Sequence, residues 1–203
     1  MIYFAGMFTG IIETIGIVRQ VIPNGSNRTF WVESAISAEF KADQSVSHSG
    51  VCLTIEDIKN NQHRVTAIDE TLQKTNLTNW QEGSLINLER SLQLNGRIDG
   101  HLVQGHVDSI GICLHKKQKK GSWEFEFSFP KKFAKLVIEK GSVCVNGISL
   151  TGFKVKKESF KVAIIPYTFG HTNIKDVSPG DALNLEFDML GKYIARNIKL
   201  NAT

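Results

Sequence analysis

A long internal repeat restricts the fold of this chain more than any other feature of its sequence. Residues 45–54 read SVSHSGVCLT and residues 142–151 read SVCVNGISLT, so the two segments align without a gap at an offset of 142 − 45 = 97 residues. The same offset carries TNL at 75–77 onto TNI at 172–174. Solenoid units span only about 20–50 residues. The repeat therefore predicts a duplicated domain.

The bulk properties are those of an ordinary soluble protein. The chain has 203 residues, so each half has just under a hundred, which is enough for a core of its own. Hydrophobic content is 41% and charged content 22%. No apolar run reaches the roughly 18–20 residues of a membrane span. The start lacks a basic signal-peptide region, so we expect a cytoplasmic protein, with residues 1–6 before Met7 as an optional extension.

Cysteine spacing and charge exclude several classes of site. The three cysteines, Cys52, Cys113 and Cys144, are an odd number and form no C-x-x-C pair. Neither a disulfide framework nor a zinc site is therefore predicted. We interpret Cys113 and Cys144 as packing residues. Net charge is +4, and the basic run KKQKK at 116–120 is more typical of a solvated hairpin tip than of a nucleic-acid contact.

Short strands dominate the predicted secondary structure. Strands are expected at 10–21, 28–32, 45–58, 64–69 and 84–88, and again at 103–115, 123–129, 142–154, 161–166 and 182–187. One brief helix is expected in each half, at 35–41 and at 130–141. Many short strands with few helices predict two small, closed or nearly closed β-barrels. The short link between the halves predicts that they pack closely or pair across subunits.

The C-terminal tail departs from the repeat. Met189, Leu190, Tyr193, Ile194 and Ile198 follow a helical spacing, which predicts an amphipathic helix. Asp188 is the expected N-cap. The apolar stripe must be buried either on the helix's own barrel or on other copies of the chain. We favour an oligomer.

Histidine provides the first candidate for proton transfer. His106 stands where the first half has Ile11, and imidazole titrates near neutral pH. A structural histidine, satisfied by its neighbours, is an equally serious interpretation of His106. His48 and His101 are assigned a structural role more firmly.

A second candidate is the pair of aligned positions occupied by Cys52 and Ser149. Each follows a glycine that would allow a flat ligand to approach the backbone, Gly50 in the case of Cys52. The alternative for Cys52 is a small buried hydrophobic residue. Ser49 and Asn146 precede the two glycines and could hydrogen-bond the same ligand edge. The spacings of a Ser-His-Asp triad, a P-loop and a Rossmann fingerprint are missing.

These motifs, taken together and in order, resemble riboflavin synthase, the type with two lumazine-binding domains. The resemblance runs from Met7 to about residue 200. It rests on MFTGII at 7–12, GVCLT at 50–54, ETL at 70–72 with TNL at 75–77, GHLVQGHVD at 100–108, GISLT at 147–151 and FDMLGKYIARN at 187–197.

The resemblance implies an all-β fold of two tandem, homologous six-stranded Greek-key barrels with a C-terminal amphipathic helix. The implied domains are an extension at 1–6, lumazine-binding barrels at 7–100 and 101–187, and an oligomerisation helix at 188–203. The implied reaction is a dismutation of two 6,7-dimethyl-8-ribityllumazine molecules, without metal or organic cofactor. The implied partners are a homotrimer formed through the helix and an association with lumazine synthase, with no nucleic acid and no membrane.

The family's site lies between one subunit's first barrel and its neighbour's second barrel. The resemblance places proton transfer on His106 and Ser149, and placement of the ring or addition to it on Cys52 and Thr151. The implied substrate-binding residues are Phe8, Gly10, Ile11, Ile12, Cys52, Leu53, Thr54, Thr66, Ala67, Ile68, Asp69, Glu70, Thr71, Gly105, His106, Val107, Lys140, Asn146, Ser149, Leu150, Thr151, Ala163, Ile164, Ile165, Pro166, Tyr167 and Thr168. Asn146 departs from the aspartate that the family often has.

Two other functions stay open at this point. A non-catalytic lumazine or flavin binder of the antenna type shares the double barrel, but such proteins tend to lose the GVCLT and GHVD motifs that are intact here. A barrel that binds nucleic acid would need aromatic platforms along a basic groove, and none is evident.

Overall fold

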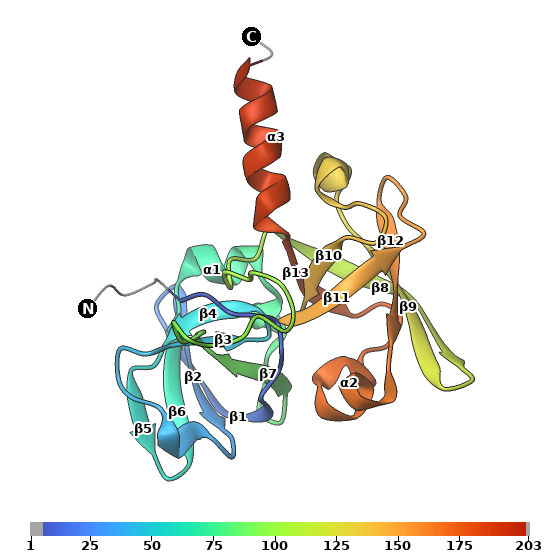
Figure 1. The fold of residues 1–203 in the computed structure, drawn as a ribbon. Helices are drawn as coiled ribbons and strands as arrows, with labels where there is room; N and C mark the ends of the chain where they lie inside the picture. The colour runs from blue at the N-terminus through green and yellow to red at the C-terminus, as the bar shows by residue number, and fades with distance from the viewer. Residues whose placement is uncertain (1–5, 202–203) are drawn as a thin grey trace.

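The computed structural model describes residues 6–201, which form two β-domains with a helix projecting from them (Figure 1). The predicted all-β architecture with a C-terminal helix is confirmed. The strands of the first half are β1 Thr14–Asn24, β2 Asn27–Glu33, β3 Ser45–His48, β4 Val51–Thr54, β5 Asp57–Lys59, β6 Gln62–Ala67 and β7 Leu85–Arg90. Those of the second are β8 Ser109–Lys119, β9 Ser122–Ser128, β10 Ser142–Val145, β11 Ile148–Phe153, β12 Ser159–Ile164 and β13 Ala182–Phe187.

The two halves close their sheets differently. The second half is a closed barrel in the order β10-β11-β12-β9-β8-β13. The first is a seven-stranded sheet in the order β4-β3-β7-β1-β2-β6-β5. Its end strands, β4 and β5, are separated by only two residues of chain. In that gap the amide of Glu56 donates to Arg64 O on β6 at 2.9 Å. Strands β4 and β5 therefore act as one interrupted strand, which curves the sheet towards a closed barrel.

The repeated segments at 45–58 and 142–154 contain tight hairpins, and the prediction of a strand along each was wrong. The turns are Ser49-Gly50 and Asn146-Gly147, with φ of 46° and 82° in the first and 47° and 82° in the second. Positive φ at both central residues is the type I′ turn, whose twist suits the right-handed twist of the flanking strands. Asn-Gly at 146–147 is the strongest short-range sequence signal for such a hairpin.

The predicted helices also need correction. Only 3-10 turns form in the two expected places, at Ser37–Glu39 and Lys131–Leu136. The strands β6 and β12 are instead followed by α-helices that the periodicity did not reveal, α1 at Asp69–Lys74 and α2 at Pro166–His171. Each has six residues, too short for an apolar stripe to be recognised. A 3-10 turn follows each helix, η2 at Asn76–Asn79 and η4 at Asn173–Asp176.

Each half has its own apolar core, and the first core contains a polar chain. His48 and His63 are fully buried, with their Nε2 atoms 2.8 Å apart. Val46 O can only accept, so His48 donates to it through Nδ1 and accepts at Nε2 from His63. His63 Nδ1 in turn accepts from the Ser37 hydroxyl, which bonds to Ser34. The donors and acceptors therefore match with both imidazoles neutral, and two charged rings would place two Nε2–H donors against each other.

The halves meet where their two hairpin turns touch. A β-carbon on Gly50 would lie 2.7 Å from the backbone nitrogen of Gly147, and one on Gly147 would lie 2.8 Å from the nitrogen of Gly50. Real β-carbons do not approach backbone atoms this closely. The repeated glycines therefore allow the two backbones to pack against each other.

Repeated asparagines hydrogen-bond around this contact. Asn87 donates to Asn146 O at 2.8 Å, and its repeat partner Asn184 donates to Ser49 O at 2.9 Å. Asn87 Oδ1 also accepts from the amide of Asn173 at 2.7 Å. Asn184 Oδ1 makes the matching bond with the amide of Asn76, at 2.8 Å. These amides are buried and, apart from Asn76 Oδ1, their side-chain atoms are paired, so they fix how the halves sit relative to each other.

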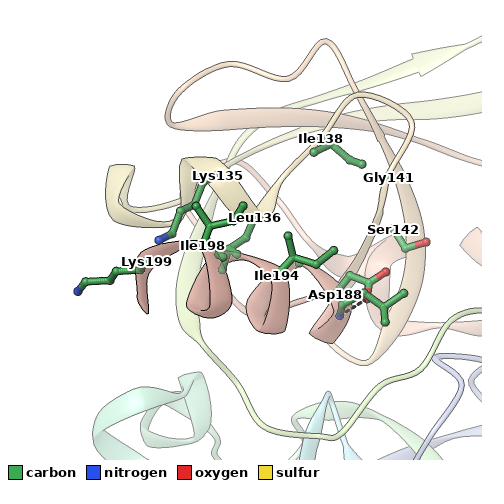
Figure 2. Close-up of a pocket in the computed structure, with 12 residues that line it drawn as sticks. Lys135, Leu136, Ile138, Gly141, Ser142, Asp188, Ile194, Ile198 and Lys199 are labelled. Atoms are coloured by element: carbon green, nitrogen blue, oxygen red, sulfur yellow. Dashed lines mark hydrogen bonds between the residues drawn. The ribbon is translucent and has the colours of Figure 1, made fainter. Parts of the chain in front are cut away.

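The tail forms α3, Met189–Asn201, with the predicted cap bond from Leu190 N to Asp188 Oδ1 at 2.9 Å. The helix leans on the Lys131–Leu136 turn and leaves a groove of about 490 Å³ beside the second barrel (Figure 2). Leu136 and Ile138 line one side of the groove, and Ile194 and Ile198 line the helix side. Both helix isoleucines stay more than 60% exposed in the single chain.

Other expectations are met in the described residues. Cys113 and Cys144 are buried packing residues, and the basic run lies at the tip of the β8–β9 hairpin. Lys116 is an exception within that run, because its ammonium donates to Lys175 O and Val177 O at the end of η4. Within residues 6–201 no helix has the length and apolar character needed to cross a membrane.

The buried histidines should make the first half acid-sensitive. Burial lowers the pKa of His48 to about 4 and of His63 to about 2. Below about pH 6.5 the unfolded chain therefore binds more protons than the folded chain does. As the pH is lowered, each histidine reduces the free energy of unfolding by about 1.4 kcal/mol per pH unit. We expect the variant H48V/H63F, which installs the residues found at the equivalent positions Val145 and Phe160, to lose this dependence in denaturant titrations from pH 7 to 4.

The comparison is made between the variant and the wild type at each pH. Buried Glu89 and Glu186, with pKa raised to about 6 and about 7, have the opposite effect but are present in both proteins. Parallel stability curves for the two proteins would contradict the assignment.

The asparagine contact should couple the two halves. Replacing Asn87 by Ala leaves Asn146 O and the amide of Asn173 without their partner, so we expect a loss of about 2–4 kcal/mol in the free energy of unfolding. Unfolding should also separate into two transitions in calorimetry. Exposed Asn95→Ala is the control and should change stability by less than about 0.5 kcal/mol. A single unshifted transition for Asn87→Ala would show that the amides do not hold the halves together.

Candidate functional site

Two segments that precede the barrels run antiparallel to each other. Phe8 N donates to Val103 O at 2.7 Å, and Val103 N donates to Phe8 O at 3.0 Å. Phe8 is fully buried, in a small cluster with Val103, Cys144 and Cys52. The start of each repeat is thus tied to the other repeat before its own barrel begins.

Each of these segments then bonds to the barrel of the opposite half. Gly10 O accepts from the amide of Ser149 on β11 at 2.8 Å. Gly105 O accepts from the amide of Cys52 on β4, also at 2.8 Å. The segment around Gly10, from the first half, therefore borders the second barrel. The segment around Gly105, which links the two halves, borders the first barrel. This exchange places the loops 10–12 and 105–107 beside Ser149 and Cys52.

Two buried glutamates hold these loops in place. Glu89 on β7 accepts from the amides of Thr9 and Gly10 at 2.6 and 3.0 Å, and from the Thr9 hydroxyl at 2.7 Å. Its repeat partner Glu186 on β13 accepts from the amides of Gln104 and His106 at 2.7 and 2.9 Å. Burial raises the pKa of both carboxyls, although the amide donors favour the charged form.

Ser149 and Cys52 each have a second polar partner. His101 Nδ1 lies 2.6 Å from Ser149 Oγ, and burial lowers the pKa of this imidazole. A neutral imidazole can accept the hydroxyl proton, so the pair is arranged for proton transfer. The Ser45 hydroxyl bonds to the Cys52 thiol, whose pKa burial nonetheless raises. Cys52 is therefore held as a thiol rather than as a reactive thiolate.

Strand alternation directs one set of side chains outward from each barrel. Gly152 on β11 pairs with Val162 on β12, and both are buried. Because side chains alternate along a strand, their neighbours Thr151 and Ala163 point outward. Ile165 continues this outward row and is exposed. The first half repeats the arrangement on β4 and β6, where Cys52 and Thr54 face out while Leu53 is buried. Each half thus presents an outer face bordered by a loop tied to the other half.

Comparison with known proteins matches both halves to one family. The lumazine binding domain family matches residues 9–91 and 104–188. The riboflavin synthase of Actinobacillus pleuropneumoniae is 36% identical over 93% of this chain and 88% of that protein. Those of Bacillus subtilis and Saccharomyces cerevisiae are 34% and 32% identical, over 94% and 96% of this chain and 89% and 87% of theirs. The chain belongs to the riboflavin synthase family.

Solved structures agree on the fold. LumP complexed with riboflavin superposes with a TM-score of 0.82 at 16% identity, over 89% of this chain and 98% of that one. LumP complexed with 6,7-dimethyl-8-(1'-D-ribityl) lumazine superposes with a TM-score of 0.80, over 88% of this chain and 98% of that one. At this identity the likeness concerns the double-barrel architecture alone.

The residues that the family resemblance implied divide into two groups. Those whose side chains lie at the outer faces or loops are at least partly exposed: Ile11, Ile12, Cys52, Thr54, Thr66, Ile68, Asp69, Glu70, Thr71, His106, Val107, Lys140, Ser149, Thr151, Ala163, Ile165, Pro166, Tyr167 and Thr168. Those buried are Phe8, Gly10, Leu53, Ala67, Gly105, Asn146, Leu150 and Ile164. The buried group can meet a ligand only through backbone atoms, or by supporting the exposed group.

Two of the implied residues have surroundings that the sequence did not suggest. Asn146 lies in the interface between the halves, where its Oδ1 accepts from the amide of Asn184 at 2.9 Å. His106 has an exposed side chain, and its backbone amide donates to Glu186. His106 lines a pocket of about 400 Å³, and Asp108 and Tyr193 line the same pocket.

Sequence reasoning missed two polar residues beside these positions. His101 was assigned a structural role, yet it is the histidine that contacts Ser149. Ser45 was not singled out, although it bonds to Cys52 across the β3–β4 hairpin. The hairpin turn at Ser49-Gly50 could have indicated Ser45, because it brings residues 45–48 beside 51–54. In residues 6–201 no cluster of three or more His, Cys, Asp or Glu side chains could hold a metal ion.

Proposed function

We infer that the protein is a riboflavin synthase, which converts two molecules of 6,7-dimethyl-8-ribityllumazine into riboflavin and 5-amino-6-(D-ribitylamino)uracil. A four-carbon unit passes from one lumazine to the other, so the atoms balance without an oxidant, a reductant or a cofactor. The observation that carries the inference is the match of both halves to riboflavin synthases over nearly their whole length.

The duplicated outer faces support this chemistry. A reaction between two identical molecules needs two related binding surfaces, and each half offers one on equivalent strands. Holding both rings in place removes much of the entropic cost of a bimolecular step. The reaction also needs a proton to leave the 7-methyl group of one lumazine, whose ring holds the resulting charge.

We assign the proton transfer to Ser149 and His101, with His106 as the second candidate. Ser149 faces outward on β11 and has a neutral imidazole behind it, which suits a group that passes on a proton. Thr151 lies on the same outer face and would position the ring. Cys52 would meet the ring on the first half, as a thiol that positions it or adds to it.

We propose that the working assembly is a homotrimer in which the first half of one copy faces the second half of the next. The exposed apolar side of α3 and the groove of Figure 2 support this, because a helix this apolar is normally covered. The domain bounds 7–100 and 101–187, the cytoplasmic location and the association with lumazine synthase belong to the same proposal.

A non-catalytic lumazine or flavin binder is the second candidate. The fold likeness to LumP structures that hold riboflavin and a lumazine favours it. The intact Cys52 and Ser149 positions, each with a polar partner, favour the enzyme.

The decisive measurement mixes purified protein with 6,7-dimethyl-8-ribityllumazine in the presence of a chelator and follows products by chromatography. We expect one riboflavin for every two lumazines consumed, because the second lumazine becomes the uracil product. Lumazine binding without riboflavin formation would favour the antenna-type binder.

The proton-transfer assignment predicts different effects for three histidines. We expect His101→Ala and Ser149→Ala each to lower kcat about a hundredfold or more, because both interrupt one relay. His115→Ala, on the exposed β8–β9 hairpin, is the control and should match the wild type. A large loss in His106→Ala with a normal rate in His101→Ala would transfer the role to His106. Thermal unfolding of each variant checks that its fold is intact.

A further inference from the structure

Each loop that reaches the opposite half is followed by a carboxylate residue that ties it to the last strand of its own half. The amide of this residue donates to a carbonyl of that strand, at 2.9 Å in both halves. The carboxylate of Glu13 accepts from the amide of Arg90 on β7 at 2.7 Å, and that of Asp108 accepts from the amide of Phe187 on β13 at 2.9 Å. The same tie is therefore made twice.

The two ties receive their positive charge from different elements. In the first half Arg90 turns its own guanidinium back to Glu13, with Nη2 2.6 Å from Oε2. In the second half the equivalent position is Phe187, which has no charge. Lys192, in the first turn of α3, supplies the ammonium instead, with Nζ 2.8 Å from Asp108 Oδ2. The tail helix, which lies outside the repeat, thus provides the cation that β7 carries itself.

The pair made by the helix is the more sheltered of the two. The side chains of Lys192 and Asp108 are 25% and 18% exposed, against 37% and 31% for Arg90 and Glu13. Solvent therefore screens the charges of Lys192 and Asp108 less. Both residues line the same pocket of about 400 Å³ as His106.

The loop that this pair holds lies at the outer face of the first half. Gly105 O accepts from the amide of Cys52 at 2.8 Å, and Val107 packs against the core of the first half. Asp108 follows Val107 directly and is fixed at the base of α3, which leaves the end of β13 (Figure 1). A shift of Asp108 would therefore pass along a short, bonded segment to the backbone beside Cys52.

Lys192 supports the same loop at a second point. Glu186 accepts from the amides of Gln104 and His106, and a carboxylate accepts such bonds better than a neutral acid does. Burial raises the pKa of Glu186 to about 7, and the nearby ammonium of Lys192 opposes that rise. The helix thus favours the charged form of the group that holds the loop.

We propose that Lys192 and Asp108 are positioning residues that couple the tail helix to the outer face of the first half. The proposal rests on the proposed function and gives α3 a role besides assembly. The helix sets the position of the loop beside Cys52, so a ligand at the first half responds to an element that follows the second half.

The test removes the charge of one partner at a time in the full-length chain. Two outer faces predict two classes of riboflavin site, which equilibrium dialysis measures in the wild type, K192M and D108N. In each variant we expect one class to bind about tenfold more weakly, because its loop loses a tie, and the other to stay within about twofold. K192R keeps the cation and should bind within about threefold of the wild type. K120M makes the same charge loss at the exposed tip of the β8–β9 hairpin and should match the wild type.

A double-mutant cycle separates coupling from two independent losses. K192M/D108N should bind no more weakly than either single variant, because each one already removes the pair. Additive losses would overturn the coupling. Sedimentation reports the assembly of each variant, and thermal unfolding reports its fold. If K192M assembles differently from the wild type, D108N decides, because it leaves the helix unaltered, and wild-type binding in D108N would then overturn the proposal.

The outcomes also distinguish this proposal from the proposed reaction. Unchanged binding in folded K192M and D108N would overturn the coupling, whatever the turnover. Wild type that binds riboflavin but forms none from the lumazine would overturn the reaction alone, and the variants would still decide the coupling. Wild type that neither binds nor forms riboflavin would overturn both, because the loop would then border no ligand face.

Discussion

The contact between the two hairpin turns is the constraint on which the rest of the molecule depends. Gly50 and Gly147 let the backbones of the two halves meet at a separation that no β-carbon permits. Buried asparagine amides then hydrogen-bond to the carbonyls and amides that this contact removes from water. Among the described residues, Asn76 Oδ1 is the buried side-chain atom that stays without a partner. A duplicated chain could place its halves in many ways, and this contact selects one.

The placement of the site follows from that contact. With the turns together, the segment at 8–12 reaches β11 and the linker at 103–107 reaches β4, where backbone hydrogen bonds join them. Glu89 and Glu186 then hold the two loops through paired amide donors. Ser149 and Cys52 thus gain neighbours from the opposite half. Each outer face is therefore bordered by backbone from both halves.

The halves have diverged within this common frame. The first core contains a histidine chain where the second has Val145 and Phe160, so polar satisfaction replaces apolar packing at the same positions. At the outer faces the change is reversed, because α2 carries Tyr167 and His171 where α1 carries an ion pair. Duplication preserved the backbone and its turns, while the side chains on equivalent strands took different chemistry.

The sequence by itself determined the duplication, the family, the barrel class and the tail helix, because repeats, motifs and periodicity are local patterns. It also identified Cys52 and Ser149 as a pair. Tertiary structure decided the contacts of the candidate residues. His101 meets Ser149 from 48 residues away, and Asn146 Oδ1 accepts from the amide of Asn184 on β13. The short helices α1 and α2 escaped prediction because six residues are too few for a helical period. Contacts between distant segments depend on how the halves pack, and no local spacing encodes that arrangement.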